Sequence, residues 1–156
     1  MRKTAIIFLV VSLIACLNGF SEGKNLRPLF EKYGIPVYAQ GERGTCSVFV
    51  VTGLLEFEYA RKSGRYVPLS VEYLNWASNQ VTGENEDGSF FSDAIKALKI
   101  YGICENDFFP YYVQNYSKKA EPSDSAIKDA KKRLSFTATW IKAWDPNTGM
   151  TAEQIE

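Results

Sequence analysis

The sequence Gln40-Gly41-Glu42-Arg43-Gly44-Thr45-Cys46 leads directly into a strongly apolar stretch, in a chain of 156 residues that contains no histidine. Its two glycines allow a tight, irregular loop. From Cys46 to Lys62 apolar side chains recur at helical spacing, and Gly64 follows as a typical helix stop. The stretch therefore predicts a loop that delivers Cys46 to the first turn of a buried helix, where unpaired backbone amides favour negative charge.

Composition predicts one globular domain. The 46% hydrophobic content is ample for a packed core, and 18 basic residues balance 18 acidic ones. No basic stripe suggests nucleic acid, because the basic cluster within residues 128–133 is typical of the cationic end of one helix. The sequence also contains no motif for a metal or another cofactor, so we expect neither.

The first 20 residues are typical of an export signal. Met1-Arg2-Lys3 supplies positive charge, and Thr4 to Ala15 is an apolar run too short to span a bilayer. The run ends at Leu13-Ile14-Ala15-Cys16, which resembles the lipobox of bacterial lipoproteins, in which the cysteine is acylated. The alternative is ordinary cleavage near Gly19-Phe20-Ser21. We therefore expect an exported protein that is either held in the cell envelope by a lipid on Cys16 or secreted, with membrane contact only through that lipid.

Periodicity and capping residues predict the remaining elements. These are a short polar lead over residues 21–34, a second helix after the N-cap Ser70, a third from about Ser89 to Tyr101 that ends at Gly102, a fourth opened by Pro122, and a strand from Phe136 to Trp144.

The last residues carry a helix-start signal. Thr151-Ala152-Glu153-Gln154 fits a capping box, yet the sequence stops at Glu156, before two helical turns could form. We therefore expect the chain to be truncated. The alternative is a frayed polar tail.

Five segments, in this order, carry a family resemblance. They are Gln40-Gly41 with Gly44-Thr45-Cys46-Ser47-Val48-Phe49, then Leu69 to Leu74, Asp87-Gly88-Ser89-Phe90, Ala94 to Ile103, and Phe109-Pro110-Tyr111. Together they resemble the papain-like cysteine peptidases of family C1, over the part of the chain from residue 33 to residue 115. The resemblance implies an α+β, papain-like fold in which residues 35–156 form a partial domain, mostly the helical left lobe, with the β-rich lobe truncated.

The same resemblance assigns the site. Cys46 would be the catalytic nucleophile, and Gln40 would contribute to the oxyanion hole. Gly88 and Ser89 would present backbone groups to an extended substrate, and Phe90 would help to wall a pocket for a substrate side chain. The alternatives are structural roles: a loop-closing hydrogen bond for Gln40, and a helix start with its N-cap for Gly88 and Ser89.

Two positions beside the nucleophile depart from the family. Its best-known members have a cysteine three residues before the nucleophile and a tryptophan after it, where this chain has Arg43 and Ser47. The disulfide that usually clamps the loop is therefore absent. We expect packing to hold the loop and Cys104 to be a free, buried thiol. The alternative is a disulfide between Cys46 and Cys104, which an oxidising compartment permits.

The general base of the family is also absent. Its histidine and orienting asparagine usually follow the nucleophile at a spacing that corresponds to about residues 176–196, outside this sequence. We therefore expect the chain to be inactive alone and to need a missing C-terminal lobe. The cleft face of the Cys46 helix, Trp140 and Trp144 should then be uncovered, and the chain should bind hydrophobic dyes.

The resemblance implies a cysteine-type peptidase that acts on protein or peptide substrates through an acyl-enzyme. The alternative is a non-catalytic, exported or lipid-anchored protein that keeps the half-fold to bind a peptide or another partner.

Overall fold

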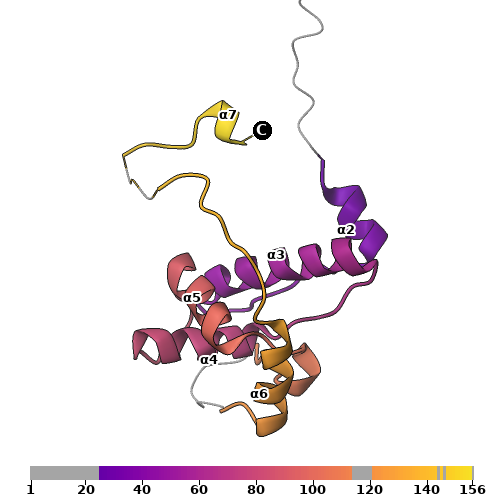
Figure 1. Cartoon of the computed structure of the whole chain (residues 1–156), viewed down its shortest axis with the longest axis vertical. Coiled ribbons are helices and arrows are strands. Elements are labelled where there is room, and N and C mark those ends of the chain that lie inside the picture. Colours follow the sequence, from indigo (N-terminus) through magenta and orange to yellow (C-terminus); the bar gives the residue numbers. More distant parts are fainter. Residues whose placement is uncertain (1–24, 114–120, 144, 146, 156) are drawn as a thin grey trace, which may run out of the picture.

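The computed structural model describes residues 25–113, 121–143, 145 and 147–155 (Figure 1). The predicted export signal, with Cys16, and Trp144 lie outside these residues. The elements are α2 (Arg27–Tyr33), α3 (Cys46–Ser63), α4 (Val71–Thr82), α5 (Phe91–Tyr101), the 3-10 helix η1 (Asn106–Phe108), α6 (Asp124–Ala130), the 3-10 helix η2 (Lys131–Arg133) and α7 (Ala152–Ile155).

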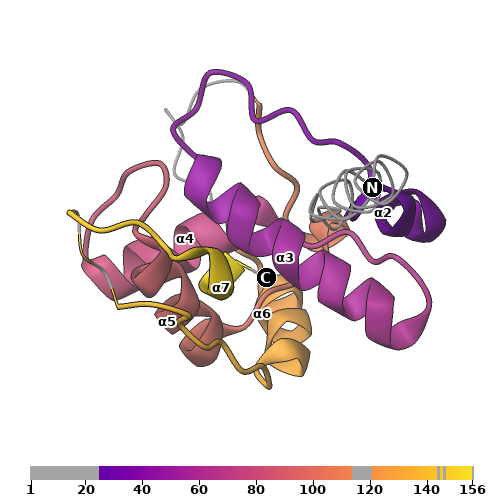
Figure 2. The ribbon, with the colours of Figure 1, turned by 90° about the horizontal axis from the view of Figure 1, so that it is seen from above.

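Three helices form the centre of the fold. α4 and α5 pack together most extensively, and α3 lies across both of them (Figures 1 and 2). Their shared core includes Val48 from α3, Leu74 from α4 and Leu98 from α5. α6 contacts η1 at one side of this core, and α2 contacts α3. The arrangement leaves the first residue of α3 at the edge of the helical layer.

The predicted helix signals are confirmed for α3 and α4. α3 begins at Cys46 and ends one residue beyond the prediction, where Gly64 adopts a left-handed conformation with φ 76°. Ser70 caps α4, because its hydroxyl accepts the Tyr73 N–H at 2.9 Å. Local chemistry was therefore sufficient to predict both helices.

Two helix starts differ from the prediction. α5 begins at Phe91 after Phe90, which gives no side-chain cap, so the helix starts two residues after the predicted start at about Ser89, and the alternative role of Ser89 as N-cap is wrong. The Ser89 side chain is turned inward instead, and its hydroxyl is buried. α6 begins at Asp124, and Ser123 caps it, with Pro122 buried just outside the helix.

The polar lead contains a helix that the sequence analysis did not predict. α2 packs its Phe30 ring against Phe57 of α3, with ring centroids 4.9 Å apart, and Tyr33 meets the same ring edge-on. Gly34 ends α2 in a left-handed conformation. A helix of seven residues has little stability of its own, so its tertiary contacts account for it better than local propensity.

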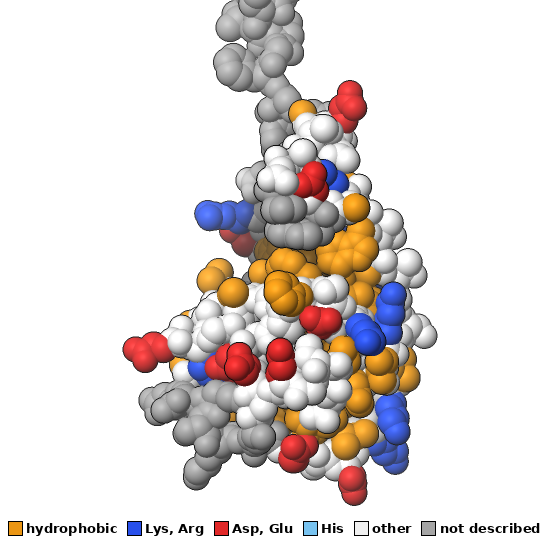
Figure 3. All heavy atoms as spheres, turned by 90° about the vertical axis from the view of Figure 1, so that its left-hand side faces the viewer, with side chains coloured by type: hydrophobic (Ala, Val, Ile, Leu, Met, Phe, Trp, Pro, Cys, Tyr) orange, Lys and Arg blue, Asp and Glu red, His pale blue; other side chains and the backbone are white. Residues whose placement is uncertain are grey.

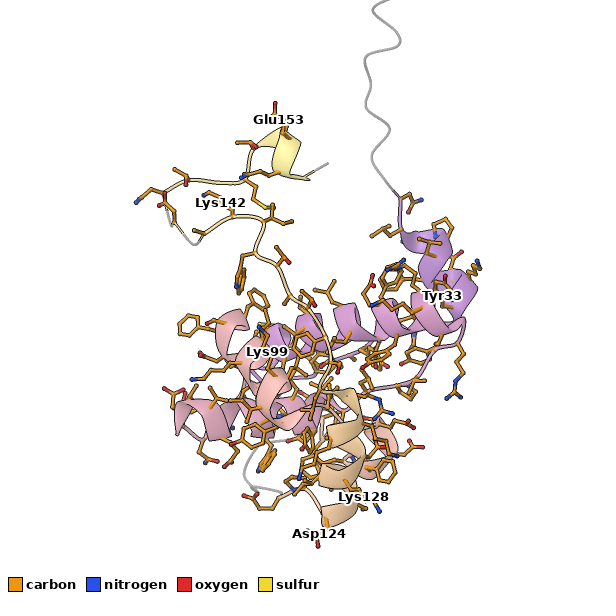
Figure 4. The ribbon with its side chains drawn as sticks, in the orientation of Figure 1. Tyr33, Lys99, Asp124, Lys128, Lys142 and Glu153 are labelled. Carbon is orange, nitrogen blue, oxygen red and sulfur yellow. The ribbon has the colours of Figure 1, made fainter. Side chains whose placement is uncertain are left out.

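The predicted strand at 136–144 is wrong for the residues that the structure describes. Residues 136–143 form no strand, and the β-bridge in the described chain joins Leu69 to Glu105 instead. An alternating sequence becomes a strand only where another strand can pair with it, and this segment, after Phe136 packs against the core, leads away from the helices (Figure 1). Lys142 lies in this outer segment, where its ammonium donates to the Thr148 carbonyl (Figure 4).

The capping box at the last residues is formed in part. The Gln154 side chain accepts the Thr151 N–H at 2.9 Å, and α7 follows.

Apolar side chains are exposed on α3 and in the outer segment, as predicted. The exposed fraction is 63% for Leu54 and 59% for Trp140, and Val50 is also exposed. Figure 3 shows hydrophobic side chains exposed among polar and charged ones on one face of the molecule. Dye binding stays a prediction. Within the described residues, no helix is both long and apolar enough to cross a bilayer.

Candidate active site

Cys46 is the first residue of α3, and its thiol is exposed and free. The preceding Thr45 is buried, and its hydroxyl shares a 2.7 Å hydrogen bond with the phenol of Tyr111. This contact fixes the backbone directly before Cys46. The thiol therefore meets solvent from a rigid helix start whose first N–H groups have no partner within the helix.

Cys104 lies in the core as a free thiol, so the prediction of a buried thiol is confirmed and the alternative disulfide is wrong. Burial raises the pKa of Cys104 to about 12.

The side chain of Gln40 closes the nucleophile loop, which we define as residues 40–46. Its Nε2 donates to the Arg43 carbonyl at 2.7 Å, and the phenol of Tyr111 donates to the Gln40 carbonyl at 2.9 Å. The loop-closing hydrogen bond considered for Gln40 is therefore present. A primary amide carries two N–H donors, so this bond leaves one for another acceptor.

Arg43 holds the loop with buried ion pairs, and the expectation that packing alone would hold it is wrong. Its guanidinium meets Glu72 of α4 at 2.6 Å and Asp87 at 2.6 Å. It also stacks on Tyr111, with Cζ 4.6 Å from the ring centroid. Only 5% of the Arg43 surface is exposed. Sequence reasoning registered this position as a missing cysteine and overlooked the charge that replaces it.

The charges around Arg43 further favour its cationic form. Burial alone would lower the pKa of Arg43, but the hydrogen bonds to Asp87 and Glu72, and the charges of both carboxylates, raise it above its ordinary value. Arg43 is therefore a permanent cation between the two acids.

The substrate loop, which we define as residues 87–90, touches the nucleophile loop backbone to backbone. Gly88 has φ +79°, and a Cβ placed on it would lie 2.4 Å from the Gly44 carbonyl oxygen. Only glycine fits this close approach without movement. The contact brings the predicted substrate-binding residues beside the predicted nucleophile.

The backbone N–H groups of Gly88 and Ser89 already have partners. The Gly88 N–H donates to Asn75 Oδ1 at 2.7 Å, and the Ser89 N–H donates to Ser47 Oγ at 3.1 Å. Among the backbone–backbone hydrogen bonds of the described residues outside the helices, none ends on the carbonyl of Gly88 or Ser89. The Phe90 side chain is 82% exposed. An incoming ligand would therefore meet two carbonyl acceptors and an aromatic surface.

Glu56 of α3 is a buried carboxylate that sequence reasoning missed. Its Oε1 accepts the Leu69 N–H at 2.7 Å and the phenol of Tyr38 at 3.2 Å, and that phenol also contacts the hydroxyl of Tyr66. Burial raises the pKa of Glu56 to about 7, although the bond from Leu69 acts in the opposite direction. An acid in the middle of an otherwise apolar helix face was the available signal.

In the described part of the chain, no group of three or more acidic, cysteine or histidine side chains could hold a metal ion.

Comparisons with known proteins fit this arrangement. The structure resembles that of xylellain, a cysteine protease from Xylella fastidiosa, with a TM-score of 0.56 and 25% identity over 62% of this chain and 41% of that one. Mouse cathepsin 7 is 32% identical over 63% of this chain, and human cathepsin L2 is 30% identical over 70%. Over these residues the chain is a distant homologue of the papain-like cysteine peptidases. No family model matches it.

This papain-like chain covers only part of its relatives. It spans 30% of mouse cathepsin 7, 28% of cat procathepsin L and 37% of human cathepsin L2. Among the described residues every regular element is helical. Both observations agree with the helical lobe of a papain-like fold.

Proposed function

We propose that Cys46 is the nucleophile of a papain-like cysteine peptidase. The observation that carries the proposal is the exposed thiol at the first residue of α3, directly beside the substrate loop. Attack by Cys46 Sγ on a peptide carbonyl would form a C–S bond. The C–N bond would then break, with a proton passing to the leaving amine, and water would hydrolyse the acyl-enzyme and release the thiol.

The oxyanion would be stabilised by two donors on the same loop. These are the backbone N–H of Cys46 and the N–H of Gln40 that is not donated to the Arg43 carbonyl. Each such donor contributes about 3 kcal/mol to the transition state in acyl-transfer enzymes. Gln40 would donate one amide N–H to the oxyanion while the other stays bonded to the Arg43 carbonyl. The position of the oxyanion hole would therefore depend on the conformation of the nucleophile loop.

Substrate would bind to the carbonyls of the substrate loop. Gly88 and Ser89 would accept N–H groups of an extended peptide, and the exposed ring of Phe90 would contact one of its side chains. Use of the Ser89 N–H would require the peptide to displace the hydroxyl of Ser47. The substrates would thus be proteins or peptides.

The proposal requires a base that this sequence does not contain, because the 156 residues include no histidine. A histidine, and the asparagine that orients it, would come from polypeptide outside residues 1–156. In subtilisin, loss of the general base lowers kcat by about 10⁶. We therefore expect these 156 residues alone to hydrolyse no peptide.

The test compares variants of the protein made from its complete gene. We expect the wild type and Cys104→Ala to cleave a fluorogenic peptide, and Cys46→Ala to fold but not to cleave it. Full activity of Cys46→Ala would overturn the proposal. A folded wild type that binds peptides, cleaves none and loses no affinity on Cys46→Ala substitution would instead support the non-catalytic alternative.

We also propose that the protein is exported. The charged start Met1-Arg2-Lys3 and the apolar run that follows it support this proposal. The mature protein should lack the first residues, as intact-mass measurement of the purified protein would establish. If Cys16 is acylated, radiolabelled palmitate should be incorporated by the wild type and not by Cys16→Ala. A cellular protein that retains Met1 would contradict export.

A further inference from the structure

We propose that Arg43 is the positioning residue of this site: its buried guanidinium sets the separation between the nucleophile loop and the substrate loop. The effect on turnover rests on the proposed peptidase function. The mechanical part, the coupling of the two loops, rests on geometry alone.

Every N–H of the guanidinium has an acceptor. Nε donates to Asp87 Oδ2 at 3.0 Å, and Nη2 donates to Asp87 Oδ1 at 2.6 Å and to Glu72 Oε1 at 3.2 Å. Nη1 donates to Glu72 Oε2 at 2.6 Å and to the Tyr112 carbonyl at 2.8 Å. The five donors of arginine are thus divided among α4, the substrate loop and the segment after η1.

The backbone of Arg43 orients the nucleophile loop at the same time. Its carbonyl accepts Nε2 of Gln40, the predicted oxyanion donor. The ring beneath the guanidinium, Tyr111, bonds the Gln40 carbonyl and the Thr45 hydroxyl through its phenol. A shift of Arg43 would therefore be transmitted to both ends of the loop that contains the nucleophile.

The substrate-loop partner of Arg43, Asp87, is also held in place by neighbouring residues. Asp87 Oδ1 also lies 3.4 Å from Nδ2 of Asn75, and Oδ1 of Asn75 accepts the Gly88 N–H at 2.7 Å. Arg43, Asp87 and Asn75 thus form a chain of contacts that ends on the backbone of the substrate loop. The close approach of Gly88 to the Gly44 carbonyl limits how near the two loops can come to each other.

A positive charge alone cannot replace these contacts of the Arg43 guanidinium. A lysine ammonium has three donors at one point, whereas the guanidinium reaches two carboxylates with paired, planar bonds. Arg43→Lys keeps the charge and so limits the cost of burying Glu72 and Asp87, but it cannot hold both acids and the Tyr112 carbonyl in this geometry. Arg43→Lys therefore separates the geometric role of Arg43 from its role in neutralising the two carboxylates.

The experiment measures hydrogen exchange and kinetics on the product of the complete gene, for the wild type, Arg43→Lys and the matched control Arg61→Lys. Arg61 forms an exposed pair with Glu58 on the same helix. We expect Arg43→Lys to speed exchange of the Gly88 and Ser89 amides about tenfold, and to lower kcat/KM about 100-fold, mainly through kcat, as misplaced catalytic groups do. Arg61→Lys should change neither quantity.

Two outcomes would overturn the proposal. One is exchange at Gly88 and Ser89 within twofold of the wild type in Arg43→Lys. The other is faster exchange with unchanged kcat/KM in an active enzyme. If Arg43→Lys does not fold, Asp87→Asn replaces it, because it weakens the bonds of Arg43 to the substrate loop and leaves its ion pair with Glu72 in place. If the wild type cleaves no peptide, the peptidase proposal fails, and the exchange measurement still decides whether Arg43 couples the loops.

Discussion

Glu72 and Glu56 are buried carboxylates on neighbouring helices, and the protein compensates them in different ways. Glu72 meets the Arg43 guanidinium and belongs to a network of charged groups. Glu56 accepts bonds from a backbone N–H and a phenol and has no cation among the contacts described, and burial raises its pKa to about 7. The acid beside the candidate site is matched by a permanent charge, whereas the acid in the middle of α3 is stabilised by a proton.

Removing the cation from the first region should give the largest effect. Arg43→Met would leave the carboxylates of Glu72 and Asp87 without their cation, so we expect the free energy of unfolding to fall by about 3–5 kcal/mol. Urea denaturation measures this loss. The triple variant Arg43→Met/Glu72→Gln/Asp87→Asn should recover most of it, because no charge is then stranded. Equal stability of Arg43→Met and the wild type would remove the contrast between the two regions.

The proton bound to Glu56 should make the free energy of unfolding depend on pH. Folding raises the Glu56 pKa from 4.5 to about 7, so the contribution of Glu56 to stability is fully present below pH 4.5 and is lost as pH rises through about 7. The loss is about 3 kcal/mol. Glu56→Gln should match the wild type near pH 4.5 and exceed its stability at pH 8. Denaturation at both pH values measures the difference, and parallel pH profiles would contradict the assignment.

A hydrogen bond between uncharged groups at the start of α4 provides a reference for the comparison of Glu72 and Glu56. Ser70→Ala removes the cap on the Tyr73 N–H and also the bond that the Ser70 hydroxyl donates to the Phe109 carbonyl, so it should lower the free energy of unfolding by about 2 kcal/mol. The loss should be the same at pH 5 and pH 8, since no ionisable group is removed. A pH-dependent loss would show that the cap is coupled to Glu56 through the adjacent Leu69.

The smallest effect should come from an exposed ion pair. Glu58→Gln breaks the pair with Arg61 on the surface of α3, and we expect no change in the denaturation midpoint beyond experimental error. A clear loss of stability would mean that burial does not explain the difference between exposed and buried acids in this protein.

The sequence was most informative where structure depends on neighbouring residues. Apolar spacing and the stop at Gly64 predicted α3, and the Ser70 hydroxyl predicted α4. Prediction failed where a distant partner decides: the described residues contain no strand with which the segment after residue 136 could pair, and α2 depends on Phe57.

In the candidate site, too, the features that depend on neighbouring residues could be predicted and those that depend on distant residues could not. Cys46 could be placed because it opens a helix that its own sequence encodes. The role of Arg43 could not be predicted, because its acids lie 29 and 44 residues further along the chain. No local pattern relates a loop arginine to two carboxylates at such separations.

The unequal burial of Cys46 and Cys104 makes the protein suitable for selective chemical labelling. Cys104 is shielded by the core, and burial raises its pKa to about 12, so little of it is thiolate at neutral pH. Within the described residues, a maleimide should therefore attach to Cys46 alone. A fluorophore placed there would sit beside the substrate loop and would report directly on whatever binds to Phe90.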